Sequence, residues 1–110
     1  MFQKSADAKP VLMLKGIERR TLTYGDSMLL VEFTIRAGAL FPEHRHAYEQ
    51  IGYLCKGSGR LWIGEECREI VPGSSWCIPA NESHKAEFLE DSVAVDIFHP
   101  VREDYLPGYE

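Results

Sequence analysis

Cysteine is scarce in this chain, and its arrangement excludes a disulfide framework. The 110 residues contain three cysteines, Cys55, Cys67 and Cys77, and no two of them form a CxxC pair. Small disulfide-stabilised domains carry an even and denser set of cysteines, and cysteine zinc sites need closely spaced pairs. We therefore expect three free thiols that behave as small buried hydrophobic side chains.

Clustered positive charge and long apolar runs are also lacking. The net charge is −5, and the sequence contains no cluster of basic residues. Because phosphate backbones are bound by clustered lysine and arginine, these features argue against a nucleic-acid partner. The apolar runs are too short to cross a bilayer, and the N-terminal segment, which carries Asp7, does not resemble a secretory signal. We expect a cytoplasmic protein with no membrane partner.

Helix signals are weak, and short alternating segments separated by Gly, Pro, Asn and Asp take their place. In the segment 28–36, for example, every second residue from Leu29 to Ile35 is apolar, which is typical of a half-buried strand. The predicted strands are Val11–Leu14, Glu18–Tyr24, Met28–Arg36, Gln50–Cys55, Arg60–Ile63, Arg68–Ile70, Ser75–Ile78, Lys85–Leu89 and Val93–Phe98. Many short strands at nearly even spacing predict an all-β sandwich or barrel.

The chain shows no internal repeat, low-complexity segment or domain boundary. We expect a single domain over residues 1–110, with a barrel core at about 27–99. An irregular N-terminal arm and a C-terminal tail would flank this core.

The first feature that carries chemistry is the segment His44-Arg45-His46. Residues at positions i and i+2 of a strand point to the same face, so the two imidazoles can chelate one ion. Neutral imidazole suits zinc, iron, nickel and similar metals.

These histidines lie in a longer pattern that resembles the first motif of the cupin family, G-x5-H-x-H-x3,4-E-x6-G. Gly38, His44, His46 and Gly57 occupy the positions of that motif, and Gln50 stands at the place of its acidic residue.

A second segment resembles the other cupin motif, G-x5-P-x-G-x2-H-x3-N. Pro79 and His84 have the spacing of that motif, and Asn81 stands at the place of its second glycine. Asparagine is the residue other than glycine that best tolerates a left-handed backbone conformation. Phe88 replaces the final asparagine, so that end of the motif is lost.

Together the two motifs imply a cupin double-stranded β-helix, which is a jelly-roll barrel. They also imply one divalent metal ion, with Zn, Ni, Mn and Fe as candidates, bound by His44, His46, Gln50 and His84. Glu49 is the alternative to Gln50, since a carboxylate is a stronger ligand. The register favours Gln50, because a shift of one residue turns a strand side chain to the opposite face.

The last predicted strand carries a carboxylate among apolar residues. A buried Asp96 is costly unless it is paired or functional. Phe98 shares its face, and Arg102 follows shortly after the strand. An acid, an aromatic side chain and a guanidinium near a metal suit an anionic, sugar-like small-molecule substrate. The alternative is that Asp96 pairs with Arg36 or Arg60 and that Arg102 lies in solvent.

Asp96, Phe98 and Arg102 match the Asp-x-Phe-x3-Arg run of small cupins of the pectin degradation protein type, which bind metal through two His, a Gln and a third His. Three residues separate His46 from Gln50, where four are expected in those proteins. The resemblance implies conversion of a ring-form unsaturated uronate to an open keto form. Asp96 would be the general acid or base, Arg102 would hold the carboxylate, and Phe98 would pack on the ring.

Two other functions stay open, a metal-dependent dioxygenase and a non-catalytic module that binds a sugar or small acid. Tyr48, Tyr53 and Trp76 are further pocket candidates, or else ordinary core and rim aromatics, and His99 is expected at the surface. Analogy with other small cupins implies a homodimer, with the segments Val11–Leu14 and Tyr105–Tyr109 as plausible contacts.

Overall fold

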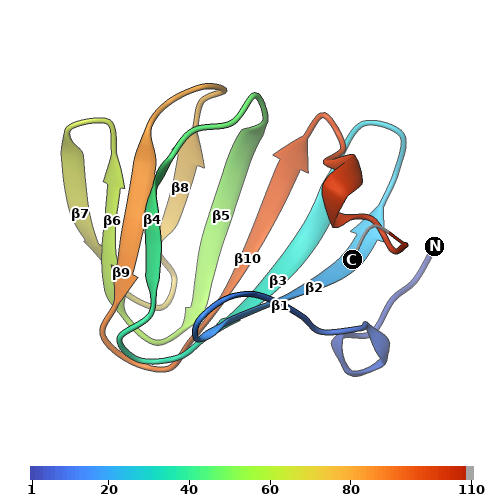
Figure 1. Cartoon of the computed structure of the whole chain (residues 1–110), viewed down its shortest axis with the longest axis horizontal. Helices are drawn as coiled ribbons and strands as arrows, with labels where there is room; N and C mark the ends of the chain where they lie inside the picture. Colours follow the sequence, from blue (N-terminus) through green and yellow to red (C-terminus); the bar gives the residue numbers. More distant parts are fainter. Residues whose placement is uncertain (109–110) are drawn as a thin grey trace.

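A computed structural model describes residues 1–108, which form two facing antiparallel sheets (Figure 1). The strands are β1 (Val11–Leu14), β2 (Ile17–Tyr24), β3 (Leu29–Ile35), β4 (Leu40–His44), β5 (Glu49–Lys56), β6 (Gly59–Ile63), β7 (Glu66–Ile70), β8 (Ser75–Ile78), β9 (His84–Phe88) and β10 (Ser92–His99). The larger sheet has the order β1-β2-β3-β10-β5-β8, and the smaller has the order β4-β9-β6-β7.

From β3 onward the chain passes repeatedly between the two sheets. Strand β4 lies in the smaller sheet, β5 returns to the larger one, β6 and β7 belong to the smaller, and β8, β9 and β10 alternate again. This winding is that of a jelly-roll barrel, so the predicted fold class is confirmed.

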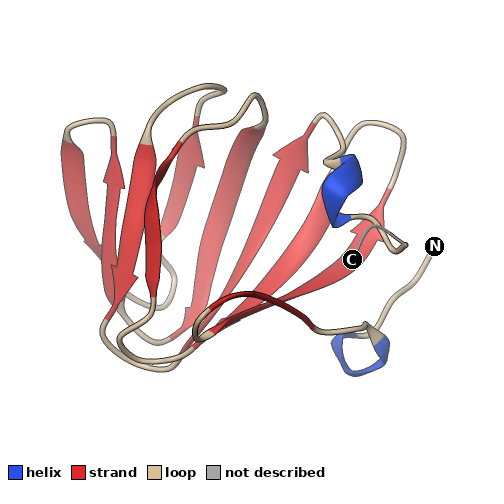
Figure 2. Ribbon diagram, in the orientation of Figure 1, coloured by secondary structure: helices blue, strands red, loops and turns tan. Residues whose placement is uncertain are grey.

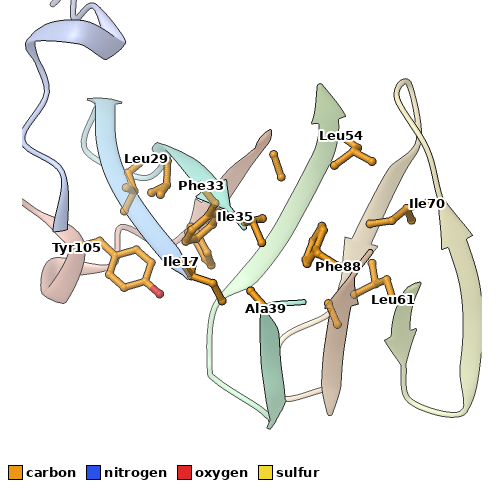
Figure 3. Packing of buried hydrophobic residues seen from close by; sticks show 14 residues of the cluster. Ile17, Leu29, Phe33, Ile35, Ala39, Leu54, Leu61, Ile70, Phe88 and Tyr105 are labelled. Carbon is orange, nitrogen blue, oxygen red and sulfur yellow. The ribbon is translucent and has the colours of Figure 1, made fainter. Parts of the chain in front are cut away.

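The core lies between the sheets because alternate residues of each strand point inward. In β3 the residues Leu29, Val31, Phe33 and Ile35 are buried, as the alternation predicted. Leu54 of β5 belongs to the same buried cluster as residues of the facing strands β6, β7 and β9, and its side chain is fully buried (Figure 3). Burial of such a side chain contributes about 1.5–3 kcal/mol to folding.

Two short 3-10 turns, η1 (Ser5–Asp7) and η2 (Glu103–Tyr105), lie beside the larger sheet (Figure 2). Tyr105 fastens η2 to β2, because the Thr21 hydroxyl donates a hydrogen bond to its carbonyl oxygen and the Arg19 guanidinium stacks on its ring. Over residues 1–108, no helix has the length and apolar character needed to cross a membrane.

Two expectations about local structure are wrong. Strand β4 was not predicted, because Pro42 and charged neighbours interrupt the strand pattern, but β4 is an edge strand, where proline is tolerated. The three cysteines are exposed and not buried. Cys55 follows an inward-facing residue and Cys77 precedes one. The two-residue period of a strand therefore turns both thiols outward.

Candidate metal centre and its pocket

Three histidines converge, two from the end of β4 and the loop after it and one from the start of β9. His44 ends β4 and lies opposite His84, the first residue of β9, while His46 follows in the loop after β4. One ring nitrogen of each histidine lies within 4.8 Å of the others. The expectation that His44 and His46 share a strand is wrong, because β4 ends at His44, yet both imidazoles reach the same point.

Each imidazole is oriented by a backbone carbonyl two residues away. The Nδ1 atoms of His44, His46 and His84 lie 2.7, 3.0 and 2.8 Å from the carbonyl oxygens of Pro42, Tyr48 and Glu82. A carbonyl only accepts, so each Nδ1 carries a proton, and in the neutral form of the ring Nε2 keeps its lone pair. This is the usual way in which a protein fixes a metal-binding histidine.

The most buried histidine of this cluster has a ring nitrogen without a partner. His84 is 5% exposed, and its Nε2 atom is buried without a hydrogen-bond partner. Burial lowers the pKa of His84 to about 4, and burial together with the charge of Arg102 lowers the pKa of His46. Both imidazoles are therefore neutral near pH 7, which is the form that binds metals. An orphaned buried nitrogen beside two further lone pairs fits a bound divalent cation.

Gln50 extends the cluster from the opposite sheet. Its amide oxygen lies 3.0 Å from Nε2 of His46, and its amide nitrogen donates a hydrogen bond to Asp96, with 2.6 Å between Nε2 and Oδ2. The amide oxygen and the His46 nitrogen are both acceptors, and a shared cation is what makes such an approach favourable. Glu49, one residue earlier, is exposed.

Asp96 lies at the base of the site on β10 and is 3% exposed. It accepts hydrogen bonds from the side chains of Gln50 and Trp76. Burial raises the pKa of Asp96 to about 6, although both hydrogen bonds act to lower it. Pairing with an arginine is wrong as an explanation of this buried acid, because Arg60 pairs with a glutamate of β9 and Arg36 is exposed.

Arg102 lies against the aromatic wall of the site and not in solvent. Its side chain is 15% exposed, and its guanidinium carbon lies 4.9 Å from the Tyr48 ring centre and 5.1 Å from that of Phe98. An ion pair of 2.9 Å with Asp104 occupies one edge of the guanidinium. The group is thus held in place and retains N–H donors for an anion.

A cavity of about 270 Å³ joins these groups. Its lining includes the three histidines, Gln50, Asp96, Phe98, Arg102, Trp76 and Tyr105. The pocket is mostly apolar with a few convergent polar groups, which is typical of a small-molecule site.

Among the further pocket candidates, Trp76 lines the cavity, whereas Tyr53 is 47% exposed on the outer face of β5. The two-residue period that turns Gln50 inward also turns Tyr53 outward, so strand periodicity could have predicted the outward position of Tyr53. Tyr105 was expected only in a dimer contact, yet it lines the pocket. His99 is exposed, as expected.

Residues 31–98 match Cupin_2, the cupin domain family, and the chain belongs to that family. Over 93 residues it is 34% identical to the pectin degradation protein KdgF of Dickeya dadantii (strain 3937), a match that covers 83% of this chain and 84% of that protein. The structure of KdgF from Halomonas sp. superposes with a TM-score of 0.91 at 29% identity, over 96% of this chain and 98% of the other. An RmlC-like cupin from Shewanella frigidimarina NCIMB 400 has the same fold, with a TM-score of 0.91 at 22% identity over 96% and 95% of the two chains.

Proposed function

We propose that this chain is a metalloenzyme that converts an unsaturated uronate from its ring form to an open keto form. The observation that carries the proposal is the convergence of three imidazoles on a pocket that also holds Asp96 and Arg102. The similarity to KdgF, a pectin degradation protein, supports a sugar acid as the substrate.

We assign His44, His46, Gln50 and His84 as the ligands of one divalent ion, with Zn, Ni, Mn and Fe as candidates. Such an ion supplies Lewis-acid polarisation of a bound oxygen. Because Gln50 is a neutral ligand, the ion would keep its full charge. Three protein nitrogens and one oxygen leave coordination positions for water or substrate.

The remaining roles belong to side chains on β10 and the segment after it. Ring opening breaks the bond between the ring oxygen and the anomeric carbon: the anomeric hydroxyl loses its proton to become a carbonyl, and the ring oxygen gains a proton to become an enol. The enol then gives up its oxygen-bound proton while its double-bonded carbon takes one, which forms the ketone. Asp96 lines the pocket, where it would act as the general acid or base for these proton transfers. Arg102 presents a planar cation to the substrate carboxylate. Phe98 lines the pocket, and we assign it to pack against the sugar ring.

The direct test is turnover of an unsaturated uronate by protein loaded in turn with each of the four metals, followed by NMR. We expect loss of the ring form with at least one metal. Failure with every metal would overturn the proposal. Oxygen consumption without isomerisation would favour a dioxygenase, and saturable binding without turnover would favour a sugar-binding module.

We also propose a single-domain protein that forms a cytoplasmic homodimer. Strand β1 exposes Leu12 and Leu14, which supports β1 as a contact segment. The other expected contact, Tyr105–Tyr109, lies partly outside the described residues. Light scattering of the wild type and a Leu12→Asp variant tests the dimer, cell fractionation tests the location, and one cooperative unfolding transition is expected for a single domain.

A further inference from the structure

One row of residues across the larger sheet connects Asp96 on β10 to β8, a strand that is not paired with β10. Asp96 on β10 lies opposite Gly52 on β5, and Gly52 lies opposite Trp76 on β8. Gly52 is buried and belongs to the inward-facing set of β5, two residues after Gln50. Because Gly52 has no side chain, the space above the middle strand of this row is free for a neighbour.

The Trp76 indole fills that space. A Cβ atom on Gly52 would lie 2.1 Å from Nε1 of Trp76 and 2.2 Å from its Cε2. The indole nitrogen therefore lies directly over Gly52, on the path from β8 to β10, and its N–H donates to the Asp96 carboxyl. Any residue with a side chain at position 52 would block this approach.

The donor and acceptor roles in this network have a fixed direction. An indole N–H only donates, and an ionised carboxylate only accepts. Gln50 can present either end of its amide, but the end next to Asp96 must donate, which leaves Oε1 3.0 Å from Nε2 of His46.

We propose that Asp96 is a positioning residue for the metal centre: its carboxylate accepts from the Trp76 indole, which reaches over Gly52, and from the Gln50 amide nitrogen, and so keeps the Gln50 amide oxygen turned toward the histidines. This inference rests on the ligand set assigned above. It adds a role for Trp76 and Gly52, and it gives Asp96 a second role beside proton transfer.

The test replaces one acceptor atom of the network with a donor. Asp96→Asn leaves a single side-chain oxygen for two donors that arrive from different strands. The Trp76 N–H cannot become an acceptor, whereas the Gln50 amide can turn over, so Gln50 is expected to direct its NH2 group at the metal. Combining Asp96→Asn with Trp76→Phe frees the introduced asparagine to offer its oxygen to Gln50 again.

The readout is Zn²⁺ affinity without substrate, measured by competition with a chromophoric chelator. We expect Asp96→Asn to weaken Zn²⁺ binding about 10- to 100-fold, the usual loss for a residue that orients a ligand. The double variant should recover most of that loss, and Trp76→Phe alone should stay within about three-fold of wild type, since the carboxylate still accepts from Gln50. Trp62→Phe, on β6, is the matched control and should change nothing.

A double variant that binds Zn²⁺ as weakly as Asp96→Asn would overturn the inference, as would wild-type affinity in Asp96→Asn. His84→Ala separates this failure from failure of the metal site itself, because a normal affinity in that variant would overturn both. If a variant does not fold, ¹⁵N NMR of the Zn²⁺-loaded wild type decides. The Gln50 amide protons should then show contacts to the Trp76 indole proton, and contacts to the imidazole protons alone would contradict the proposed direction.

Discussion

The guanidinium carbon of Arg102 lies 3.9 Å from the centre of the Tyr105 ring. Arg19 stacks on the same ring at 4.2 Å, so one aromatic side chain holds two cations, of which Arg102 lines the cavity at the metal centre. Such stacking of a guanidinium on an aromatic ring is worth about 0.5–2 kcal/mol, depending on burial. Tyr105 therefore holds the planar group of Arg102 at the pocket wall before any substrate binds.

The planar shape of this cation should matter as much as its charge. Arg102→Lys keeps the charge but loses the stack and the two-pronged donor geometry, so we expect KM for an unsaturated uronate to rise about ten-fold or more. Steady-state kinetics check this, with Arg68→Lys on the exposed strand β7 as the control. An unchanged KM in Arg102→Lys would show that the substrate carboxylate binds elsewhere.

Metal content should depend on His84, which is buried in the cluster, and not on His99, which lies outside it. His84→Ala removes the nitrogen that is buried without a partner, and we expect elemental analysis to find little bound metal in that variant. His99→Gln changes a histidine outside the cluster and should keep the wild-type metal content. Equal metal content in the two variants would contradict the assigned site.

Metal removal should lower thermal stability. A ligand that binds only the folded state at about 100 times its Kd adds about 2.7 kcal/mol. For a chain of this size that gain raises Tm by roughly 10–20 °C. Calorimetry of wild type with Zn²⁺ and with a chelator measures the difference. The same comparison in His84→Ala should show almost none, and an equal shift there would mean that the metal binds at another place.

The glycine under the Trp76 indole should not tolerate a side chain. Gly52→Ala places a methyl group 2.1 Å from Nε1 of Trp76, so overpacking is expected to cost about 1–3 kcal/mol of the free energy of unfolding. Gly25→Ala is the matched control, because nothing lies within 4 Å of a Cβ there, and its effect should stay within about 0.5 kcal/mol. Urea unfolding of both variants decides, and equal stability would mean that the indole moves aside at little cost.

Asn81 should be replaceable by glycine but not by valine. Its φ angle is 66°, in the left-handed region, and its backbone N–H donates to the carbonyl of His46 over 2.7 Å. Asn81→Val is expected to lose about 2 kcal/mol, and Asn81→Gly to stay within about 1 kcal/mol of wild type. The unfolding midpoints in urea test this, and a valine variant as stable as the glycine variant would contradict it.

Asn81 also shows how much the sequence could predict. Its place at a family glycine predicted a left-handed residue, which the backbone confirms. Strand periodicity likewise predicted the inward face of β3 and nine of the strands, because alternation reports directly which side is buried. The same rule would have placed Tyr53, Cys55 and Cys77 outside the barrel, had it been applied to residues usually found in protein interiors.

Other features depend on contacts between distant segments and left little local signal. Strand β4 forms because it pairs with β9, although Pro42 breaks its pattern. The stack of Arg102 on Tyr105 depends on the path of the chain after β10, which periodicity does not report. Gly52 carries no chemistry in the sequence, and its importance appears only when β8 and β5 are side by side.

The three imidazoles take their orientation from carbonyls within their own short segments, whereas the amide ligand takes its orientation from side chains on two other strands. The histidine part of the centre is therefore insulated from substitutions elsewhere in the barrel. Only the orientation of Gln50 depends on side chains of other strands. Substitutions on β8 and β10 could therefore change the metal preference of the site during evolution while all three histidines are retained.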